Sequence, residues 1–199
     1  MKIYDISQEV FTSMVYPGDP KPERRTLQSM ENGDTYNLTA FSMCAHNGTH
    51  VDAPRHFIKD GSAIDEISPE AFVGRAYVAE HSGALTAADA EAILKRAGEC
   101  DPESAKRILI KGEAEVTLAA AEVFAASGIL LLGNESQSVG PEDAPMAVHI
   151  ALLSRGAVLL EGIRLASVPE GAYLLSAAPL NLSGADGSPC RALLIDDGK

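Results

Sequence analysis

Short apolar runs rich in Ile, Leu and Val alternate along this chain with alanine-rich segments of helical character, and this alternation restricts the fold more than any other feature. It predicts strands interleaved with helices, which is an α/β fold. Several runs are apolar at nearly every position, as is typical of strands with both faces of the sheet covered. The predicted strands are KIYDIS (2–7), TYNLTAFSM (35–43), RAYVAE (75–80), RILIKG (107–112), GILLLG (128–133), AVLLEG (157–162), AYLLS (172–176) and RALLID (191–196).

Three segments have the start and stop signals of helices. Each follows a cap-like residue or begins at a proline, and each ends at a glycine, which suits the left-handed position that closes a helix. The predicted helices are AADAEAILKRAG (87–98) after Thr86, LAAAEVFAASG (118–128) after Thr117, and PEDAPMAVHIALLSRG (141–156) from Pro141.

No internal repeat or change of composition marks a linker between domains. PGDPKPERR (17–25) and GADGSP (184–189) are predicted turn regions. A length of 199 residues suits one domain with a sizeable core. We therefore expect a single compact domain spanning residues 1–199.

The charge balance restricts the partners. The chain has 16 basic and 28 acidic residues and a net charge of −12, which would repel nucleic acid and anionic lipid. The start MKIYDISQEV lacks the apolar core of a signal peptide, and the strongest apolar runs are shorter than a membrane span. We expect a cytoplasmic protein without nucleic-acid or membrane partners.

The three cysteines, Cys44, Cys100 and Cys190, are odd in number and form no CxxC pair. This pattern argues against a disulfide framework and against a thiolate zinc site, so we expect reduced thiols. Cys44 stands two residues before His46, where it is either a soft metal ligand or a small buried filler at a strand end.

The segment CAHNGTHVDAPRHF, residues 44–57, holds three of the five histidines of the chain, with Asp52 among them. Gly48 and Pro54 interrupt any helix there, so the segment is predicted to be a loop. A turn at Gly48 can fold His50 back beside His46. His50 and Asp52, two residues apart in extended chain, then point the same way.

Two imidazoles and one carboxylate are the ligand set of a catalytic zinc or a similar divalent ion, with one coordination position left for water or substrate. The alternative is that these histidines cap strand ends or lie in solvent. Against that alternative, His46, His50 and Asp52 occur together with a glycine turn and a proline in one short segment.

The stretch HNGTHVDAPRHF resembles the HxGTHxDxPxHF signature of the cyclase-type metal-dependent hydrolases, which include bacterial kynurenine formamidase and isatin hydrolase. YDISQEV and VYPGDP are similar to the opening of that family, and PLNLSGADGSPCRALLI is similar to its ending. The resemblance implies an α/β fold with a swivelling β/β/α arrangement and a mixed sheet. It also implies a homo-oligomer.

By this resemblance, His46, His50 and Asp52 would bind the first metal ion, and His56 would be a general acid/base beside it. In members with two ions, the aspartate bridges to a second ion, held by a helix histidine and by a strand glutamate twelve residues later. His149 and Glu161 match that spacing.

His149 and Glu161 also stand out without the resemblance. His149 lies in the apolar segment MAVHIALL, and Glu161 ends the apolar run AVLLE, where an unpaired charge would be costly. A cation would offset that cost. The alternative is a core histidine with a satisfied hydrogen bond and a carboxylate at the surface. His81 has no such partners and is expected to be structural or solvated.

Two features depart from the family pattern. The family commonly has Asp, Ser and Asp before the third helix, whereas ESQSVG here places Glu135 first and Gly140 last. The chain also has no tryptophan, so an aromatic wall over a substrate ring would need Tyr16, Tyr36, Phe41 or Phe57.

Metal-assisted hydrolysis of a small amide, formamide or lactam is the leading hypothesis, with zinc as the expected metal and manganese as the alternative, in one or two copies. His56, with an ordinary pKa of about 6.5, suits proton transfer between water and a leaving amine. The same site could also run a cyclisation or dehydration, or bind a small molecule without turnover. No GxSxG elbow, P-loop or GxGxxG motif indicates another chemistry.

The N-terminal segment VYPGDPKPERR contains three prolines and is expected to extend away from its own core. Together with the resemblance, this predicts a homodimer or a higher homo-oligomer.

Overall fold

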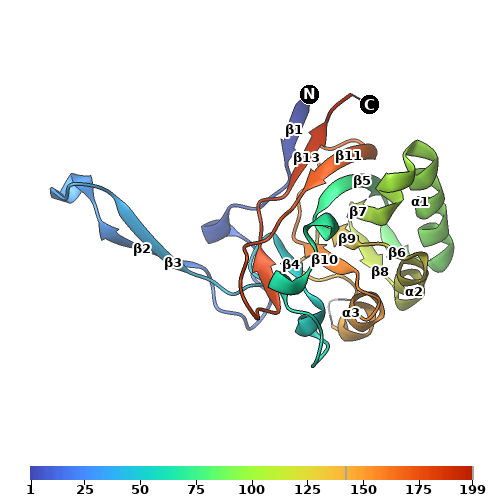
Figure 1. The fold of residues 1–199 in the computed structure, drawn as a ribbon, viewed down its shortest axis with the longest axis horizontal. Helices are drawn as coiled ribbons and strands as arrows, with labels where there is room; N and C mark the ends of the chain where they lie inside the picture. Colours follow the sequence, from blue (N-terminus) through green and yellow to red (C-terminus); the bar gives the residue numbers. More distant parts are fainter. Residues whose placement is uncertain (142, 199) are drawn as a thin grey trace.

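A nine-stranded mixed sheet lies at the centre of this computed structural model, which describes residues 1–141 and 143–198 (Figure 1). The four central strands, β5, β7, β9 and β10, run parallel, and the flanking strands are antiparallel to their neighbours. The predicted α/β class with a mixed sheet is confirmed. In sheet order the strands are β1 (Lys2–Asp5), β13 (Leu193–Asp196), β11 (Gly171–Ser176), β5 (Val73–Glu80), β7 (Arg107–Lys111), β9 (Leu131–Asn134), β10 (Val158–Glu161), β4 (His50–Asp52) and β12 (Gly187–Pro189).

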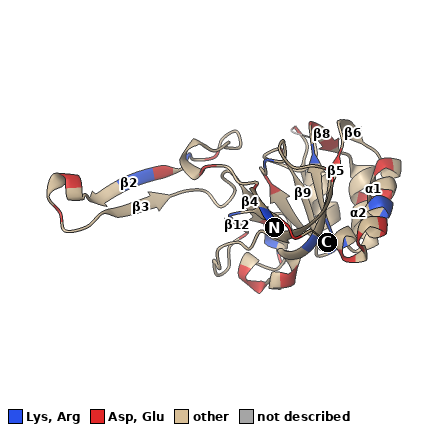
Figure 2. Cartoon of the chain, turned by 90° about the horizontal axis from the view of Figure 1, so that it is seen from above, with Lys and Arg blue, Asp and Glu red and all other residues tan. Residues whose placement is uncertain are grey.

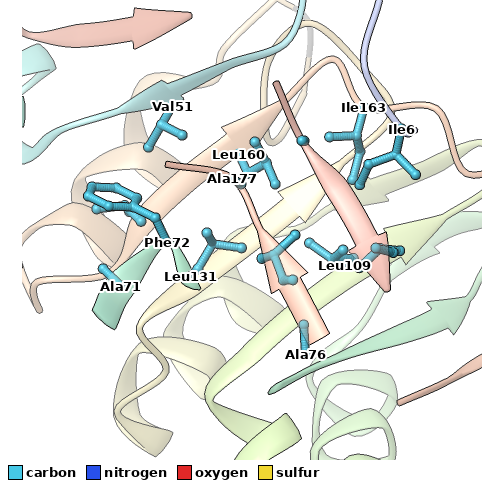
Figure 3. Packing of buried hydrophobic residues seen from close by; sticks show 14 of the residues in the cluster. Ile6, Val51, Ala71, Phe72, Ala76, Leu109, Leu131, Leu160, Ile163 and Ala177 are labelled. Carbon is cyan, nitrogen blue, oxygen red and sulfur yellow. The ribbon is translucent and has the colours of Figure 1, made fainter. Parts of the chain in front are cut away.

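Both faces of the sheet are buried, which explains the continuous apolar runs. Along β7, Ile108 and Ile110 point into the cluster that the helices cover, where Phe124 and Leu152 are fully buried. Leu109, between them, points to the opposite face and packs in a second cluster (Figure 3). That second cluster also contains Val51, Phe72, Leu131, Leu160 and Ile163.

Three helices cover one face of the sheet in the described residues: α1 (Ala87–Cys100), α2 (Leu118–Ser127) and α3 (Met146–Leu153) (Figure 1). Thr86 and Thr117 cap α1 and α2 as predicted, because their side-chain oxygens accept hydrogen bonds from Asp89 N and Ala120 N. None of the described helices is long and apolar enough to cross a membrane.

Three predicted helix limits were wrong, and one of them is the end of the third helix, which lies at Leu153 and not at Gly156. Gly98 does not end α1, which continues to Cys100 and is followed by Asp101 at the cap position. The third helix begins at Met146, not at Pro141, because Pro145 disfavours the helical conformation in the residue before it. Part of the predicted first turn, Glu142, lies outside the described residues.

Several short strands were not predicted. Residues 44–57 were expected to be a loop, but His50–Asp52 form β4 between β10 and β12. The turn region 184–189 contains β12, and the turn region 17–25 runs into β2 (Glu23–Gln28). The pair β6 (Gly83–Leu85) and β8 (Ala114–Val116) was also missed. β4, β6, β8 and β12 exist because they pair with distant segments, whereas β2 pairs with β3 in a local hairpin.

A two-stranded hairpin of β2 and β3 (Leu38–Ser42) projects from the rest of the chain (Figures 1 and 2). We call residues 23–42 the arm. The arm leaves several large apolar side chains exposed: Leu27, Met30, Tyr36, Leu38 and Phe41. The proline-containing segment 15–25 was expected to extend away from its own core, but only residues 23–25 belong to the arm. Tyr16 and Asp19 instead line a cavity beside His46.

Candidate metal centre

The candidate site lies where β4 pairs with β10. His50 stands opposite Glu161 in this antiparallel register, and Asp52 stands opposite Leu159. His50 and Asp52 are two residues apart in a strand, so their side chains point to the same side of the sheet. Helix α3 places His149 over that side, with Nε2 3.2 Å from Oε1 of Glu161. Segments that are far apart in the sequence therefore meet at one point.

Among the described residues, three groups of three side chains have the composition and spacing of divalent metal sites, and two of these share Asp52. His46, His50 and Asp52 form one group, and Asp52, His149 and Glu161 form the other. Within each group the nitrogen and oxygen atoms that could bind an ion lie within 4.8 Å of one another. Asp52 belongs to both groups, so its two oxygens can serve two neighbouring ions.

The backbone fixes the orientation of two of these rings. Nδ1–H of His50 donates to Gly48 O at 3.0 Å, and Nδ1–H of His149 donates to Pro145 O at 2.9 Å. Because a carbonyl oxygen can only accept a hydrogen bond, both rings carry their proton on Nδ1. Their Nε2 atoms are left facing the carboxylates, which is the orientation that a metal ligand needs.

The cluster is buried. His50, Asp52, His149 and Glu161 are each at most 2% exposed. His50 Nε2 and Asp52 Oδ2 have no hydrogen-bond partner among the described residues, although His50 Nε2 lies 3.4 Å from Asp52 Oδ1 and 3.3 Å from Glu161 Oε2. Leaving such groups unpaired is expensive, and a cation between them would satisfy both. The donor set therefore fits one or two divalent ions.

The pKa shifts of the metal-free cluster also indicate a site that attracts cations. Burial alone would lower the pKa of His50, but Asp52 and Glu161 raise it to about 10. At His149, Asp52 and Glu161 likewise outweigh the effect of burial and raise the pKa to about 10. Burial opposes ionisation of Asp52, but the surrounding histidines hold its pKa well below the usual range. Protons and metal ions thus compete for the same nitrogen atoms.

His56 lies beside this cluster, at the rim. Its side chain is 27% exposed, and its Nε2 lies 4.0 Å from Oδ2 of Asp52. The imidazole packs on that of His46, with ring centroids 4.0 Å apart. Burial lowers the pKa of His56 and outweighs the opposing effect of Asp52, so the neutral ring is favoured at pH 7. This environment suits a proton acceptor.

Asp186 is a site residue that the sequence analysis missed. Its Oδ2 lies 2.8 Å from Nε2 of His46 and 3.3 Å from Nδ1 of His56. The other nitrogen of His46, Nδ1, lies 2.8 Å from Oδ1 of Asp52. GADGSP was interpreted as a turn within the stretch that resembles the ending of the family, and no local pattern reveals that β12 lies next to β4.

The loop that departs from the family pattern supports the site. Gln137 Nε2 donates to the carbonyls of His46 and Gly48, at 2.9 and 2.8 Å. Val139 N donates to Oε1 of Glu161 at 2.6 Å. Glu135 points elsewhere and accepts from Gly112 N and Leu165 N. The loop thus holds the segment of residues 46–48 in place without a second aspartate.

A cavity of about 430 Å³ opens above the cluster. Of the four aromatic residues considered for a substrate wall, Tyr16 and Phe57 line this cavity, whereas Tyr36 and Phe41 lie on the arm. The remaining lining residues outside the cluster are Asp19, Cys44, Gln137, Ser138, Pro145 and Asp186.

Two further residues considered in the sequence lie outside the metal groups of the described chain. Cys44 is half-buried, and its Sγ lies 3.8 Å from Oδ2 of Asp19. His81 lies at a distant turn, where its Nε2 is 3.4 Å from Ala84 O, which agrees with a structural or solvated role.

Comparison with known proteins gives the same family as the sequence signature. Residues 4–141 match the model of the Cyclase family, described as "Putative cyclase". Kynurenine formamidase from Salinibacter ruber is 34% identical over 98% of this chain and 98% of its own length.

Two solved structures share the fold of this chain over nearly its whole length. One is a potential metal-dependent hydrolase with cyclase activity, with a TM-score of 0.80 and 28% identity over 97% of this chain and 96% of that one. Isatin hydrolase A from Ralstonia solanacearum has a TM-score of 0.83 over 98% of this chain and 92% of that one. At 21% identity, this second likeness concerns the fold alone.

Proposed function

Because this chain belongs to the Cyclase family, we propose that it is a metal-dependent hydrolase that cleaves the C–N bond of a small formamide, amide or lactam. One observation carries the proposal. Asp52 is common to two ligand groups whose other members, His46, His50, His149 and Glu161, line a cavity of about 430 Å³, and His56 lies beside them with a lowered pKa. Kynurenine formamidase, the activity named for the Salinibacter ruber relative, is of this arylformamidase type.

In this proposal His46, His50 and Asp52 hold the first ion, and Asp52, His149 and Glu161 hold a second. Zinc is the expected metal, because imidazole and carboxylate ligands with an open position are typical of catalytic zinc, and manganese is the alternative. When bound, the ion would acidify a water molecule and polarise the carbonyl of the substrate.

The residues of the chain move the protons. His56 Nε2 lies 4.0 Å from Oδ2 of Asp52, beside the residues that would hold the ion, so it can accept the proton of the attacking water. The new C–O bond forms as the water adds to the carbonyl carbon. His56 then returns the proton to the nitrogen as the C–N bond breaks, which gives a carboxylic acid and an amine. For a formamide these products are formate and the free amine.

The cavity wall favours a flat, partly apolar substrate. Phe57 and Pro145 supply apolar surface, and Tyr16 supplies an aromatic ring. Asp19 and Ser138 are polar groups on the same wall. An aryl formamide or a fused aromatic lactam would place its ring against the apolar and aromatic side chains and its polar substituents near Asp19 and Ser138.

Turnover and metal content test the proposal together. The protein is stripped with a chelator, reloaded with zinc or manganese, and assayed with N-formylaniline and with a fused aryl lactam. We expect formate release or ring opening in the reloaded protein and one or two ions per chain by elemental analysis. The Asp60→Asn variant, an exposed aspartate outside the cavity, is the matched control. If the metal-loaded protein binds these compounds tightly without turning them over, the hydrolase proposal is wrong and the protein is a small-molecule binder.

We further propose a homo-oligomer in the cytoplasm. The arm extends from the body and leaves five large apolar side chains exposed, which a second copy could cover (Figure 1). The three cysteines are free thiols, as expected in a reducing compartment.

A further inference from the structure

We propose that Asp186 is a positioning residue that sets the tautomers of two histidines at once, so that His46 presents Nδ1 to the first ion and His56 presents Nε2 to the reacting water. This inference rests on the proposed hydrolase function. It assigns a role to a residue that lies outside the HxGTHxDxPxHF signature.

The geometry places one oxygen between two rings. Asp186 Oδ2 lies 2.8 Å from His46 Nε2 and 3.3 Å from His56 Nδ1. A carboxylate only accepts hydrogen bonds, so each of these nitrogens carries the proton. His56 Nε2 is then left with a free lone pair. His46 Nδ1 also faces a carboxylate oxygen in the metal-free chain, and an ion in the first group would take the place of its proton. His46 Nδ1 lies 2.8 Å from Asp52 Oδ1, and His56 Nε2 lies 4.0 Å from Asp52 Oδ2.

Asp186 completes a pattern among the histidines of the site. His50 and His149 donate Nδ1–H to backbone carbonyls and turn Nε2 toward the cluster. His46 is oriented the other way round, with Nε2 outward. Its Nε2–H faces the side-chain carboxylate of Asp186 rather than a backbone carbonyl. One oxygen of that carboxylate therefore accepts from both His46 and His56. A ligating histidine that donates its other N–H to a carboxylate is a common arrangement in metal enzymes.

The backbone around Asp186 is built to hold this carboxylate. Ala53 N donates to Asp186 O at 2.9 Å, and the next residue, Gly187, pairs with Asp52 across β12 and β4. Asp186 therefore moves with the strand that carries Asp52. A Cβ atom at Gly187 would come within 2.7 Å of Cε1 of His46 and 2.8 Å of Val51 O, so only glycine lets the His46 ring lie here.

Asp186 is an acceptor in this arrangement rather than a ligand of its own ion. His46, His56 and Asp186 also have metal-like spacing. An ion bound to that group would use His46 Nε2, while the first site uses His46 Nδ1. The ring would then have to lose both protons, which a neutral imidazole does not do near pH 7.

The first test reads the tautomers directly. Two-bond nitrogen–proton NMR spectra of ¹⁵N-histidine protein, with and without zinc, report which nitrogen carries the proton. We expect Nε2–H at His46 in the zinc-loaded protein and Nδ1–H at His56 in both forms. A zinc-loaded protein with Nδ1–H at His46 would overturn the proposal. The His56 result in the metal-free form does not depend on turnover or on metal binding, so it separates this inference from the proposed function.

The second test compares three variants. Asp186→Ala should lose about 10- to 100-fold in zinc affinity or in kcat, the usual effect of removing such an outer partner, with KM little changed. Asp186→Asn should recover most of the loss, because its amide oxygen can still accept from both rings. Asp60→Asn is the matched control and should behave as the parent protein does. If Asp186→Asn is as impaired as Asp186→Ala, the residue acts through charge and the positioning role is wrong. If Asp186→Ala keeps normal zinc affinity and kcat, Asp186 has no role in the site.

Discussion

Glu161 stands directly opposite His50 across the antiparallel pair of β10 and β4, and its Oε2 lies 3.3 Å from Nε2 of His50. The two residues are at most 2% exposed and come from segments separated by more than half of the chain. Backbone hydrogen bonds of a central sheet thus set their spacing. A metal centre built on such strands is held more rigidly than one built on loops.

The first prediction concerns the ligand groups. His50→Ala and Asp52→Ala should abolish turnover and lose bound metal, because three ligands leave little redundancy and the remaining groups lose their orientation. His149→Ala and Glu161→Ala should lower the metal content from two ions to one if two are bound. Elemental analysis of the purified variants measures this, with His81→Ala as the histidine control. Full metal occupancy in Asp52→Ala would contradict the assignment.

The second prediction separates proton transfer from metal binding. His56→Ala should keep most of its metal and lose about 10²- to 10⁴-fold in kcat, the usual range for a positioned proton-transfer group. The pKa of His56 is lowered, so the neutral base persists below pH 6.5. The acid limb of the kcat/KM profile should therefore lie below pH 6.5, and it should disappear in His56→Ala. Loss of metal from this variant would instead make His56 a ligand.

The third prediction concerns the stability of the metal-free protein. The pKa values of His50 and His149 are raised from 6.5 to about 10, so the protonated rings stabilise the fold fully below pH 6.5. That contribution is lost as the pH rises through 10. The Tm of chelator-treated protein should fall over this range, whereas excess zinc should raise Tm and remove most of the fall. Calorimetry at several pH values checks both curves. A Tm of the metal-free protein that rises with pH would contradict the proposed protonation.

The fourth prediction concerns assembly through the arm. Leu38→Asp or Met30→Asp should weaken self-association, because each buries a charge if a second copy covers the exposed apolar surface. Ala88→Asp adds the same charge at an exposed position of α1, outside the arm, and is the control. Light scattering at micromolar concentration measures the mass. If the parent protein is monomeric at micromolar concentration, the proposed assembly through the arm is wrong.

The sequence alone was enough for most regular elements. Each of the eight predicted runs overlaps a strand, and the caps at Thr86 and Thr117 begin α1 and α2. These signals are local, since strand and helix periodicity and cap chemistry depend on a few neighbouring residues. The approach of His50 and Asp52 was also predictable, because two residues of extended chain place them on one side.

The three-dimensional structure decided what depends on distant partners. His50–Asp52 form a strand only because β10 and β12 pair with them, and a segment of three residues has no periodicity to detect. His149 and Glu161 were chosen with the help of the family signature, since spacing alone does not show that α3 lies over β4. Asp186 gave no local signal at all. Its carboxylate reaches His46 and His56 because hydrogen bonds between β12 and β4 join segments more than 130 residues apart, and such pairing is a property of the folded sheet rather than of either segment.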